Sequence, residues 1–183
     1  GTDSDKINFS NNTANGSFGS LSGVKNAHTA ISSGDGVGIM ISGTDSVGAT
    51  TTDNDKVDFS NSTANGSFGS LALGRVRGMG ISSNDGYGVA GGGHTSNNSR
   101  DNDCDKINFS NNTANGSFGN MAAGRKSGFG ISSGDGEGVF ATGNILNDYT
   151  SDDCDKVDFS NSTANGSFGD ATTARRYGAG TGY

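Results

Sequence analysis

The stretch DKINFSNNTANGSFG at residues 5–19 decides the fold, because it returns three more times along the chain at intervals of 50 residues. The third copy, at residues 105–119, is identical to the first, whereas the second and fourth, at 55–69 and 155–169, read DKVDFSNSTANGSFG. This alternation indicates duplication of a two-unit block. A fixed period of this size is typical of repeat proteins, whose units bury their apolar faces against one another. The chain therefore divides into units 5–54, 55–104 and 105–154 and a partial unit 155–183.

The composition favours short strands and tight turns over helices. Of 183 residues, 33 are Gly and none is Pro, and Asn, Asp, Ser and Thr make up much of the remainder. These are turn-forming residues, so we expect an all-β fold with almost no helix. Ten phenylalanines argue against disorder, because burying each would contribute about 2–3 kcal/mol.

Charge and hydropathy exclude some partners. A net charge of −7 argues against a nucleic-acid partner, because phosphates require a basic surface. No apolar run approaches the roughly 20 residues of a membrane-spanning helix. The first residues, GTDSDKI, contain neither an initiator Met nor a signal peptide, which leads us to expect a processed product or a portion of a longer protein.

The second unit begins with a predicted hairpin. Residues 78–82, GMGIS, place Met79 and Ile81 on one face with the period of two that is typical of a strand. The Asp-Gly pair that follows is a strong signal for a two-residue hairpin turn. Residues 87–93 predict the second strand, whose final glycines permit close approach to a neighbouring backbone.

A polar loop at residues 94–103 leads to a second predicted hairpin. Ile107 and Phe109 face one way in the predicted third strand, residues 105–110. NNTANG at residues 111–116 ends in Asn-Gly and predicts a turn, after which residues 117–121 predict a weak fourth strand. Four antiparallel strands in about 50 residues form one blade of a β-propeller.

The order of these features resembles the kelch repeat. Arg75 and Arg125 precede first strands, glycines end the second strand at residues 91–93, Phe59 stands at the position of a kelch Tyr, and Phe68 stands at the position of a kelch Trp. The chain is most similar to the degenerate kelch-like repeats in tail-fibre and virion-surface proteins of phages and large viruses. The resemblance implies a kelch-like β-propeller on a virion surface or another extracellular appendage.

We expect three complete blades, at residues 28–71, 78–121 and 128–171. Residues 177–183 and 5–21 would combine into a composite fourth blade that lacks its second strand. Eight apolar residues of the third strands should point into the packing between blades: Ile7, Phe9, Val57, Phe59, Ile107, Phe109, Val157 and Phe159.

The connections between strands fall into an invariant set and a variable set. In a four-stranded blade, the connections from strand one to two and from three to four emerge on one face, and these are nearly identical in all units. The other connections vary and emerge on the opposite face. Recognition usually lies in loops on a rigid scaffold, so we predict that the variable face binds a ligand, although drift without function is a rival interpretation. The candidate ligand-binding residues are His94, Asn97, Arg100, Asp148, Tyr149, Arg75, Arg125 and Arg175.

Aspartates cluster before each third strand. Alternating carboxylates suit Ca²⁺, which takes six to eight oxygen ligands. A Lys follows each cluster where an EF-hand loop would have Gly, and no distal Glu is present. Solvated carboxylates are therefore the favoured interpretation. We expect no cofactor, with Ca²⁺ as the alternative. The candidate Ca²⁺ ligands are Asp101, Asp103, Asp105, Asp152, Asp153 and Asp155.

The sequence disfavours an enzyme. His28 and His94 occupy non-equivalent repeat positions and neither lies in a nucleophile or metal motif. Cys104 and Cys154 share one repeat position, and equivalent positions of neighbouring blades should lie too far apart for a disulfide. We expect a non-enzymatic binding or adhesion module that contacts a receptor, a glycan or a structural protein. The alternative is a purely structural array, such as a fibre spacer or decoration protein, with or without stabilisation by Ca²⁺.

Overall fold

The structure, a computed structural model, describes residues 2–83, 85–96 and 99–180. It contains three four-stranded antiparallel sheets and one two-stranded sheet. Within the described ranges, the one helical segment is the short 3₁₀ turn η1 (Leu146–Asp148). The prediction of an all-β fold is therefore confirmed. None of the helical structure described is long and apolar enough to cross a membrane.

Each four-stranded sheet is built from strands that are consecutive in the chain. β1 (Asp3–Asn8) and β2 (Thr13–Ser20) form the two-stranded sheet, called here the N-terminal hairpin. Blade 1 contains β3 (Thr29–Ser32), β4 (Val37–Thr44), β5 (Thr50–Asp58) and β6 (Thr63–Phe68). Blade 2 contains β7 (Met79–Ser82), β8 (Tyr87–Gly91), β9 (Cys104–Asn108) and β10 (Thr113–Phe118). Blade 3 contains β11 (Phe129–Ser132), β12 (Glu137–Asn144), β13 (Thr150–Asp158) and β14 (Thr163–Asp170).

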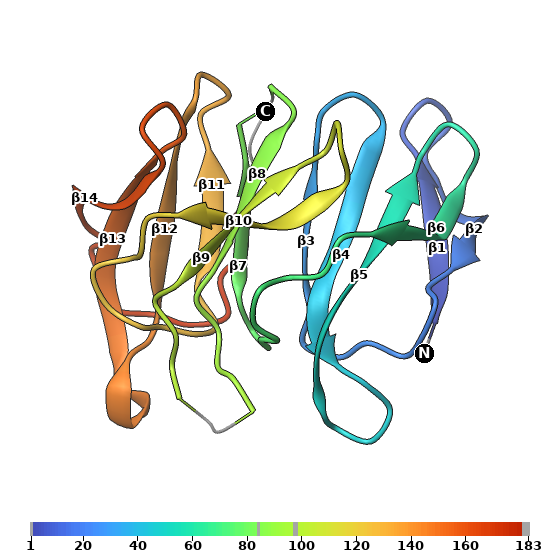
Figure 1. Cartoon of the computed structure of the whole chain (residues 1–183). Coiled ribbons are helices and arrows are strands. Elements are labelled where there is room, and N and C mark those ends of the chain that lie inside the picture. Colours follow the sequence, from blue (N-terminus) through green and yellow to red (C-terminus); the bar gives the residue numbers. More distant parts are fainter. Residues whose placement is uncertain (1, 84, 97–98, 181–183) are drawn as a thin grey trace.

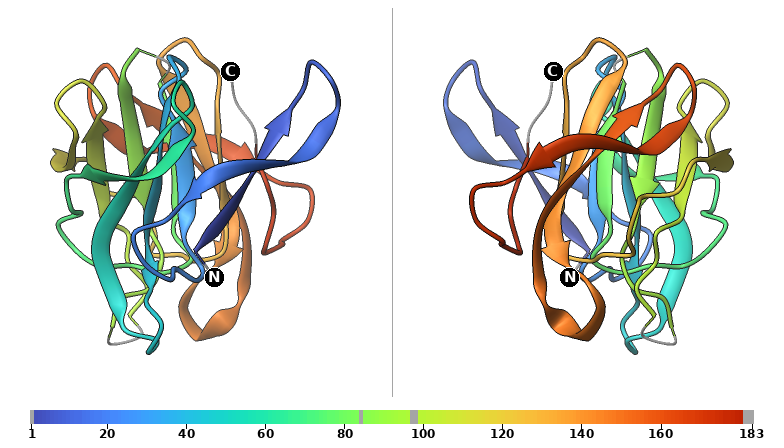
Figure 2. Two further views of the ribbon diagram at one scale, coloured as in Figure 1. Left: turned by 90° about the vertical axis from the view of Figure 1, so that its right-hand side faces the viewer. Right: turned by 90° about the vertical axis from the view of Figure 1, so that its left-hand side faces the viewer.

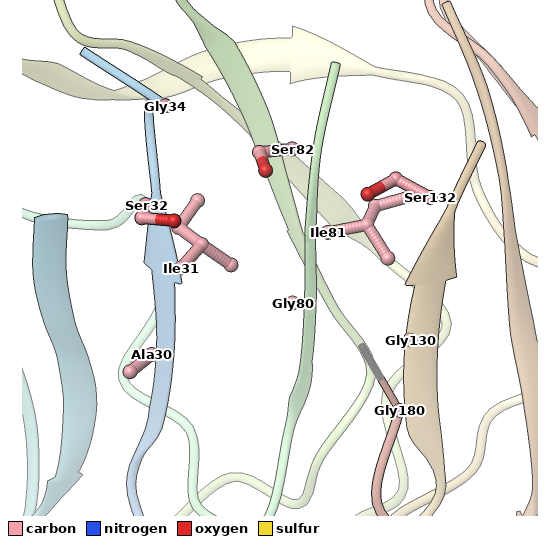
Figure 3. Close-up of a pocket in the computed structure, with 10 residues that line it drawn as sticks. All are labelled: Ala30, Ile31, Ser32, Gly34, Gly80, Ile81, Ser82, Gly130, Ser132 and Gly180. Atoms are coloured by element: carbon pink, nitrogen blue, oxygen red, sulfur yellow. The ribbon is translucent and has the colours of Figure 1, made fainter. Parts of the chain in front are cut away.

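The sheets stand side by side in a propeller-like row that begins with the N-terminal hairpin and ends with blade 3 (Figure 1). The short first strands β3, β7 and β11 are neighbours at the centre of the row (Figures 1 and 3). The hydrophobic core lies between the sheets, in one cluster for each junction. At every junction a Phe from a fourth strand meets a Phe that follows a third strand, with ring centroids 5.5 to 5.9 Å apart: Phe18 with Phe59, Phe68 with Phe109, and Phe118 with Phe159.

Five of the eight predicted core residues are buried, and three are not. The buried ones are Val57, Ile107, Phe109, Val157 and Phe159. Ile7, Phe9 and Phe59 are more than half exposed, so the prediction is wrong for them. The N-terminal hairpin has a neighbouring sheet on one side only, and with two strands it is too small to cover blade 1 completely.

The predicted Asn-Gly turn is also wrong, because that pair lies in the fourth strand. In blade 2 the chain reverses around Asn112, whose φ is 55°. The side-chain oxygen of Asn108 accepts hydrogen bonds from the amide of Ser110 at 3.0 Å and from its hydroxyl at 2.7 Å. Gly116 lies in β10 opposite Lys106, at an irregularity in the strand register. A side chain at Gly116 would place its Cβ only 3.0 Å from the Lys106 Cβ, which explains why glycine follows the asparagine.

The composite blade is not formed by the residues that the structure describes. Residues 171–180 contain no strand, and the N-terminal hairpin lies at the opposite end of the row from β14 (Figures 1 and 2). Gly180 nevertheless lies against β11, because a Cβ there would collide with the Gly130 carbonyl oxygen. The described part of the C-terminal segment thus lies beside β11, in the place of a first strand.

Candidate functional site

The long, variable connections lie together on one face of the molecule, which we call the loop face. In Figure 1 the β4–β5, β8–β9 and β12–β13 connections project from the lower edge, and the short hairpin turns project from the upper edge. This arrangement agrees with the alternation predicted for antiparallel blades.

A groove of about 440 Å³ lies on the loop face between blade 1 and blade 2. The β4–β5 loop is held in shape by Asp45, whose side-chain oxygen accepts hydrogen bonds of 2.9 Å from the amides of Val47 and Ala49. Across the groove, His94 is fixed by a pair of backbone hydrogen bonds of 3.0 Å with Val76. The groove is lined by Thr44, Gly48, Ala49, Thr50, His94, Thr95 and Ser96.

His94 is the titratable side chain among the residues that line this groove. Burial lowers its pKa below the usual 6.5, and the nearby cations Lys126, Arg77 and Arg100 lower it further. The imidazole is therefore neutral at pH 7, with one ring nitrogen as a donor and the other as an acceptor; the N–H at Nδ1 faces the Thr95 carbonyl oxygen, so Nε2 is left as an acceptor for the groove. Its Nδ1 lies 3.3 Å from the Thr95 carbonyl oxygen.

An ionic cluster connects the loops of blades 2 and 3. Asp148 Oδ1 accepts a hydrogen bond of 3.2 Å from the side-chain amide of Asn144, and it lies 2.5 Å from Arg100 Nη2 and 3.2 Å from Lys126 Nζ. These donors lower the pKa of Asp148 to about 2. Tyr149, the next residue, is exposed. Arg100, Asp148 and Tyr149 thus lie on the loop face, as the sequence predicted.

Two of the candidate arginines lie inside the molecule instead of on its surface. The Nη2 atoms of Arg75 and Arg125 lie 2.7 Å from the carboxylates of Asp105 and Asp155, respectively. Each arginine thereby joins one unit to the next, and both are buried. Arg175, at the equivalent position, is exposed. Asn97 lies outside the described residues.

The candidate Ca²⁺ ligands are dispersed. Burial raises the pKa of Asp105 and of Asp155 despite the opposing effect of their arginine partners. Asp101 accepts a hydrogen bond from the Asp103 amide at 3.1 Å, and Asp153 accepts one from the Ser151 hydroxyl at 2.7 Å. In the described part of the chain, no three His, Cys, Asp or Glu side chains are grouped so that they could hold a metal ion. Asp152 is exposed.

A smaller hollow of about 180 Å³ lies at the centre of the row of sheets. Figure 3 shows that Ser32, Ser82 and Ser132, together with Ile31 and Ile81, come from the three first strands around it. The sequence carried a signal for this hollow, because the three serines occupy one repeat position. No such signal pointed to the groove, because its lining differs between units.

Both cysteines are free. Cys104 is buried, and burial raises the pKa of its thiol to about 12. Such a thiol is protonated at neutral pH and is a poor nucleophile.

Comparison with known proteins supports the fold. No protein-family model matches the chain, and no curated protein matches it. Among solved structures 118 chains match. One of them is YjhT, which is 13% identical in sequence and superposes with a TM-score of 0.76 over 98% of this chain and 65% of the YjhT chain. This chain therefore spans slightly less than two thirds of YjhT, and the similarity shows a shared fold.

Proposed function

We propose that this chain is a non-enzymatic binding module on a virion surface or another extracellular appendage, and that the loop face holds its ligand. The groove between the β4–β5 and β8–β9 loops is the observation that carries the proposal. Its walls come from loops that differ in every unit, while the sheets that support them repeat almost unchanged. A rigid scaffold with variable loops is the usual arrangement of a recognition surface.

The lining of the groove suits a ligand rich in hydroxyl groups, such as a glycan. Thr44, Thr50, Thr95 and Ser96 carry hydroxyl groups, and the neutral His94 ring adds an acceptor at Nε2. No carboxylate is among the lining residues. The proposal includes no reaction, because His94 alone offers no partner for acid–base or nucleophilic catalysis.

The finer fold assignment is that of a kelch-like β-propeller. It is supported by the glycines at the ends of the second strands, which are Gly43, Gly93 and Gly143 with φ of 93° to 109°. A Cβ at Gly43 or Gly143 would lie 2.6 or 2.7 Å from the carbonyl oxygen of Asn26 or Lys126. Glycine is thus required where each second strand passes the segment that enters its blade.

Glycan-array binding followed by calorimetry tests this proposal. Ala49 is an exposed residue in the wall of the groove, so Ala49→Tyr should obstruct the groove without disturbing the fold. We expect it to weaken glycan binding at least tenfold. The matched control is Gly134→Asn, which gives the first hairpin turn of blade 3 the sequence of its nearly identical counterpart in blade 2 and should leave binding unchanged. Equal glycan affinities for wild type and Ala49→Tyr would refute the assignment of the groove.

A further inference from the structure

The two ends of the row of sheets carry the two halves of a contact that is repeated at every internal junction. At each junction, the fourth strand of one unit and the segment after it meet the third strand of the next unit and the turn after it. An ion pair and an aromatic pair recur at all three junctions, and a backbone hydrogen bond recurs at the two junctions between four-stranded blades. At the outer ends, the corresponding groups have no such partner among the residues that the structure describes.

The ion pairs recur every 50 residues. Their distances are 3.8 Å for Lys25–Asp55 and 2.7 Å for both Arg75–Asp105 and Arg125–Asp155. The next cation in this series is Arg175, and the carboxylate that precedes the series is Asp5. Both are exposed, and neither makes an ion pair with another described residue. One end thus offers the cation and the other the carboxylate of the same pair.

The aromatic pairs show the same pattern. At the junctions between four-stranded blades, Phe109 and Phe159 are 7% and 8% exposed, whereas Phe59, which meets the smaller N-terminal hairpin, is 54% exposed. The corresponding residue at the start of the series, Phe9, is 87% exposed, and the last fourth-strand ring, Phe168, is 62% exposed. Phe168 stands in the series Phe18, Phe68 and Phe118, whose rings each meet the Phe of the next unit. Phe9 therefore has the position of the partner that Phe168 lacks.

The backbone hydrogen bond places the two surfaces in register. Gly69 donates its amide to the Asn112 carbonyl oxygen, and Gly119 donates to the Ser162 carbonyl oxygen, both at 2.8 Å. Glycine is required at these contacts, because a Cβ at either position would lie 2.8 Å from the accepting oxygen. Gly169 occupies the next position of the series, and space is open around it. Its φ is 93° and it lies within β14, whereas Gly69 and Gly119 follow their strands and are not among the glycines with positive φ.

We propose that a second copy of this chain docks its N-terminal hairpin on the exposed end of blade 3. Asp5 of one copy then pairs with Arg175 of the other, Phe9 packs on Phe168, and Gly169 donates its amide to the Asn12 carbonyl oxygen. The N-terminal hairpin and blade 3 lie at opposite ends of the row (Figure 1), so the contact joins copies head to tail. A heterologous contact of this kind produces a closed ring or an open filament.

The contact follows from the three junctions already present in the molecule, and it is independent of the groove and of any ligand. Its charge complementarity also specifies direction. Hairpin against hairpin would bring Asp5 to Asp5, and blade 3 against blade 3 would bring Arg175 to Arg175, so only the head-to-tail arrangement pairs opposite charges.

Sedimentation velocity of the 183-residue chain over a range of concentrations tests the proposal. The wild type should associate, with a weight-average mass that rises with concentration. Arg175→Asp and Asp5→Arg should each weaken association by more than about 30-fold, because each places like charges in a buried contact. An equimolar mixture of the two variants restores opposite charges at both contacts and should associate. Circular dichroism should show unchanged folding, because both residues are exposed in the single chain.

Arg176→Asp is the matched control. It makes the same change of charge at an exposed neighbouring residue, outside the repeated ion-pair series, and should associate like the wild type. A wild type that stays monomeric at every concentration would overturn the proposal. That result is expected if the two ends of one chain pack against each other. Association of either charge variant alone at wild-type strength, or failure of their mixture to associate, would also overturn it.

Discussion

At the scale of single residues, burial in this molecule depends on the neighbouring unit as much as on the sequence around the residue. Phe9 and Phe109 lie in identical 15-residue copies, yet Phe9 is exposed and Phe109 is buried with its ring centroid 5.9 Å from that of Phe68. Comparison of the two positions therefore separates the effect of the junction on side-chain burial from the effect of the local sequence.

Replacing Phe109 with Ala should lower the free energy of unfolding by about 3–5 kcal/mol, since a buried aromatic leaves a cavity when it is truncated. Phe9→Ala is the internal control and should cost less than about 1 kcal/mol, as expected for a surface substitution. Urea unfolding, monitored by circular dichroism at a concentration where the chain is monomeric, measures both. Equal losses for the two variants would contradict a core confined to the junctions.

His94 should titrate with a pKa below 6.5, because the folded chain buries the ring and surrounds it with cations. The unfolded state then binds the proton more readily than the folded state. The stability contributed by neutral His94 is complete above pH 6.5 and is lost as the pH falls through the interval down to the folded-state pKa. Histidine ring chemical shifts measured by NMR give the midpoint directly, and a midpoint at or above 6.5 would contradict the burial of this ring.

At the scale of strands and turns, the sequence predicted the hairpins from local signals. Alternation at Met79 and Ile81 together with Asp-Gly located β7 and β8, and alternation at Ile107 and Phe109 located β9. The second turn was misplaced, because Asn-Gly suggested a turn where it marks an irregular strand. The informative signal was the Asn or Asp two residues before a Ser: Asp58 and Asp158 accept hydrogen bonds of 2.9 Å from the amides of Ser60 and Ser160, as Asn108 does in blade 2.

The candidate site was predicted at the level of the loop face but not of the groove. Variation among the loops identified the β8–β9 and β12–β13 connections, and the structure brings Arg100 and Asp148 together there. The groove depends on the distance between two blades, which no local sequence signal encodes. Arg75 and Arg125 were assigned to the surface because they lie in connections that vary between units, whereas their pairing with aspartates of the next unit keeps them buried.

The ion pairs between blades give a prediction that uses the repeat as its own control. Arg125→Ala should destabilise the fold by about 3–5 kcal/mol, because it leaves the buried Asp155 carboxylate without its partner. Arg175→Ala removes the equivalent but exposed residue and should leave the stability of the monomer unchanged. Thermal or urea unfolding of the two variants provides the measurement, and a stable Arg125→Ala variant would show that Asp155 finds another partner or becomes protonated.

At the scale of the whole molecule, stability should not depend on Ca²⁺. The buried aspartates at the junctions are engaged by arginine or lysine, so a cation already neutralises them. A Ca²⁺ ion that bound only the folded state would stabilise it by mass action, and its removal would lower the melting temperature. Without such a site, a chelator should leave the melting temperature unchanged within about 1 °C. A large fall on chelation that added Ca²⁺ reverses would instead identify a structural metal site.

The near-identity of the junctions has a consequence for how the chain folds. The hairpins of all four units present almost the same surface to the neighbouring sheet. A newly formed hairpin can therefore pack against the sheet of a distant unit nearly as well as against that of the adjacent unit. Chain connectivity then selects the correct docking, because closing a loop across one unit costs less entropy than closing it across two or three. Refolding from denaturant should populate misdocked intermediates, whereas synthesis from the N-terminus presents each hairpin with a single preceding unit and so selects the correct order.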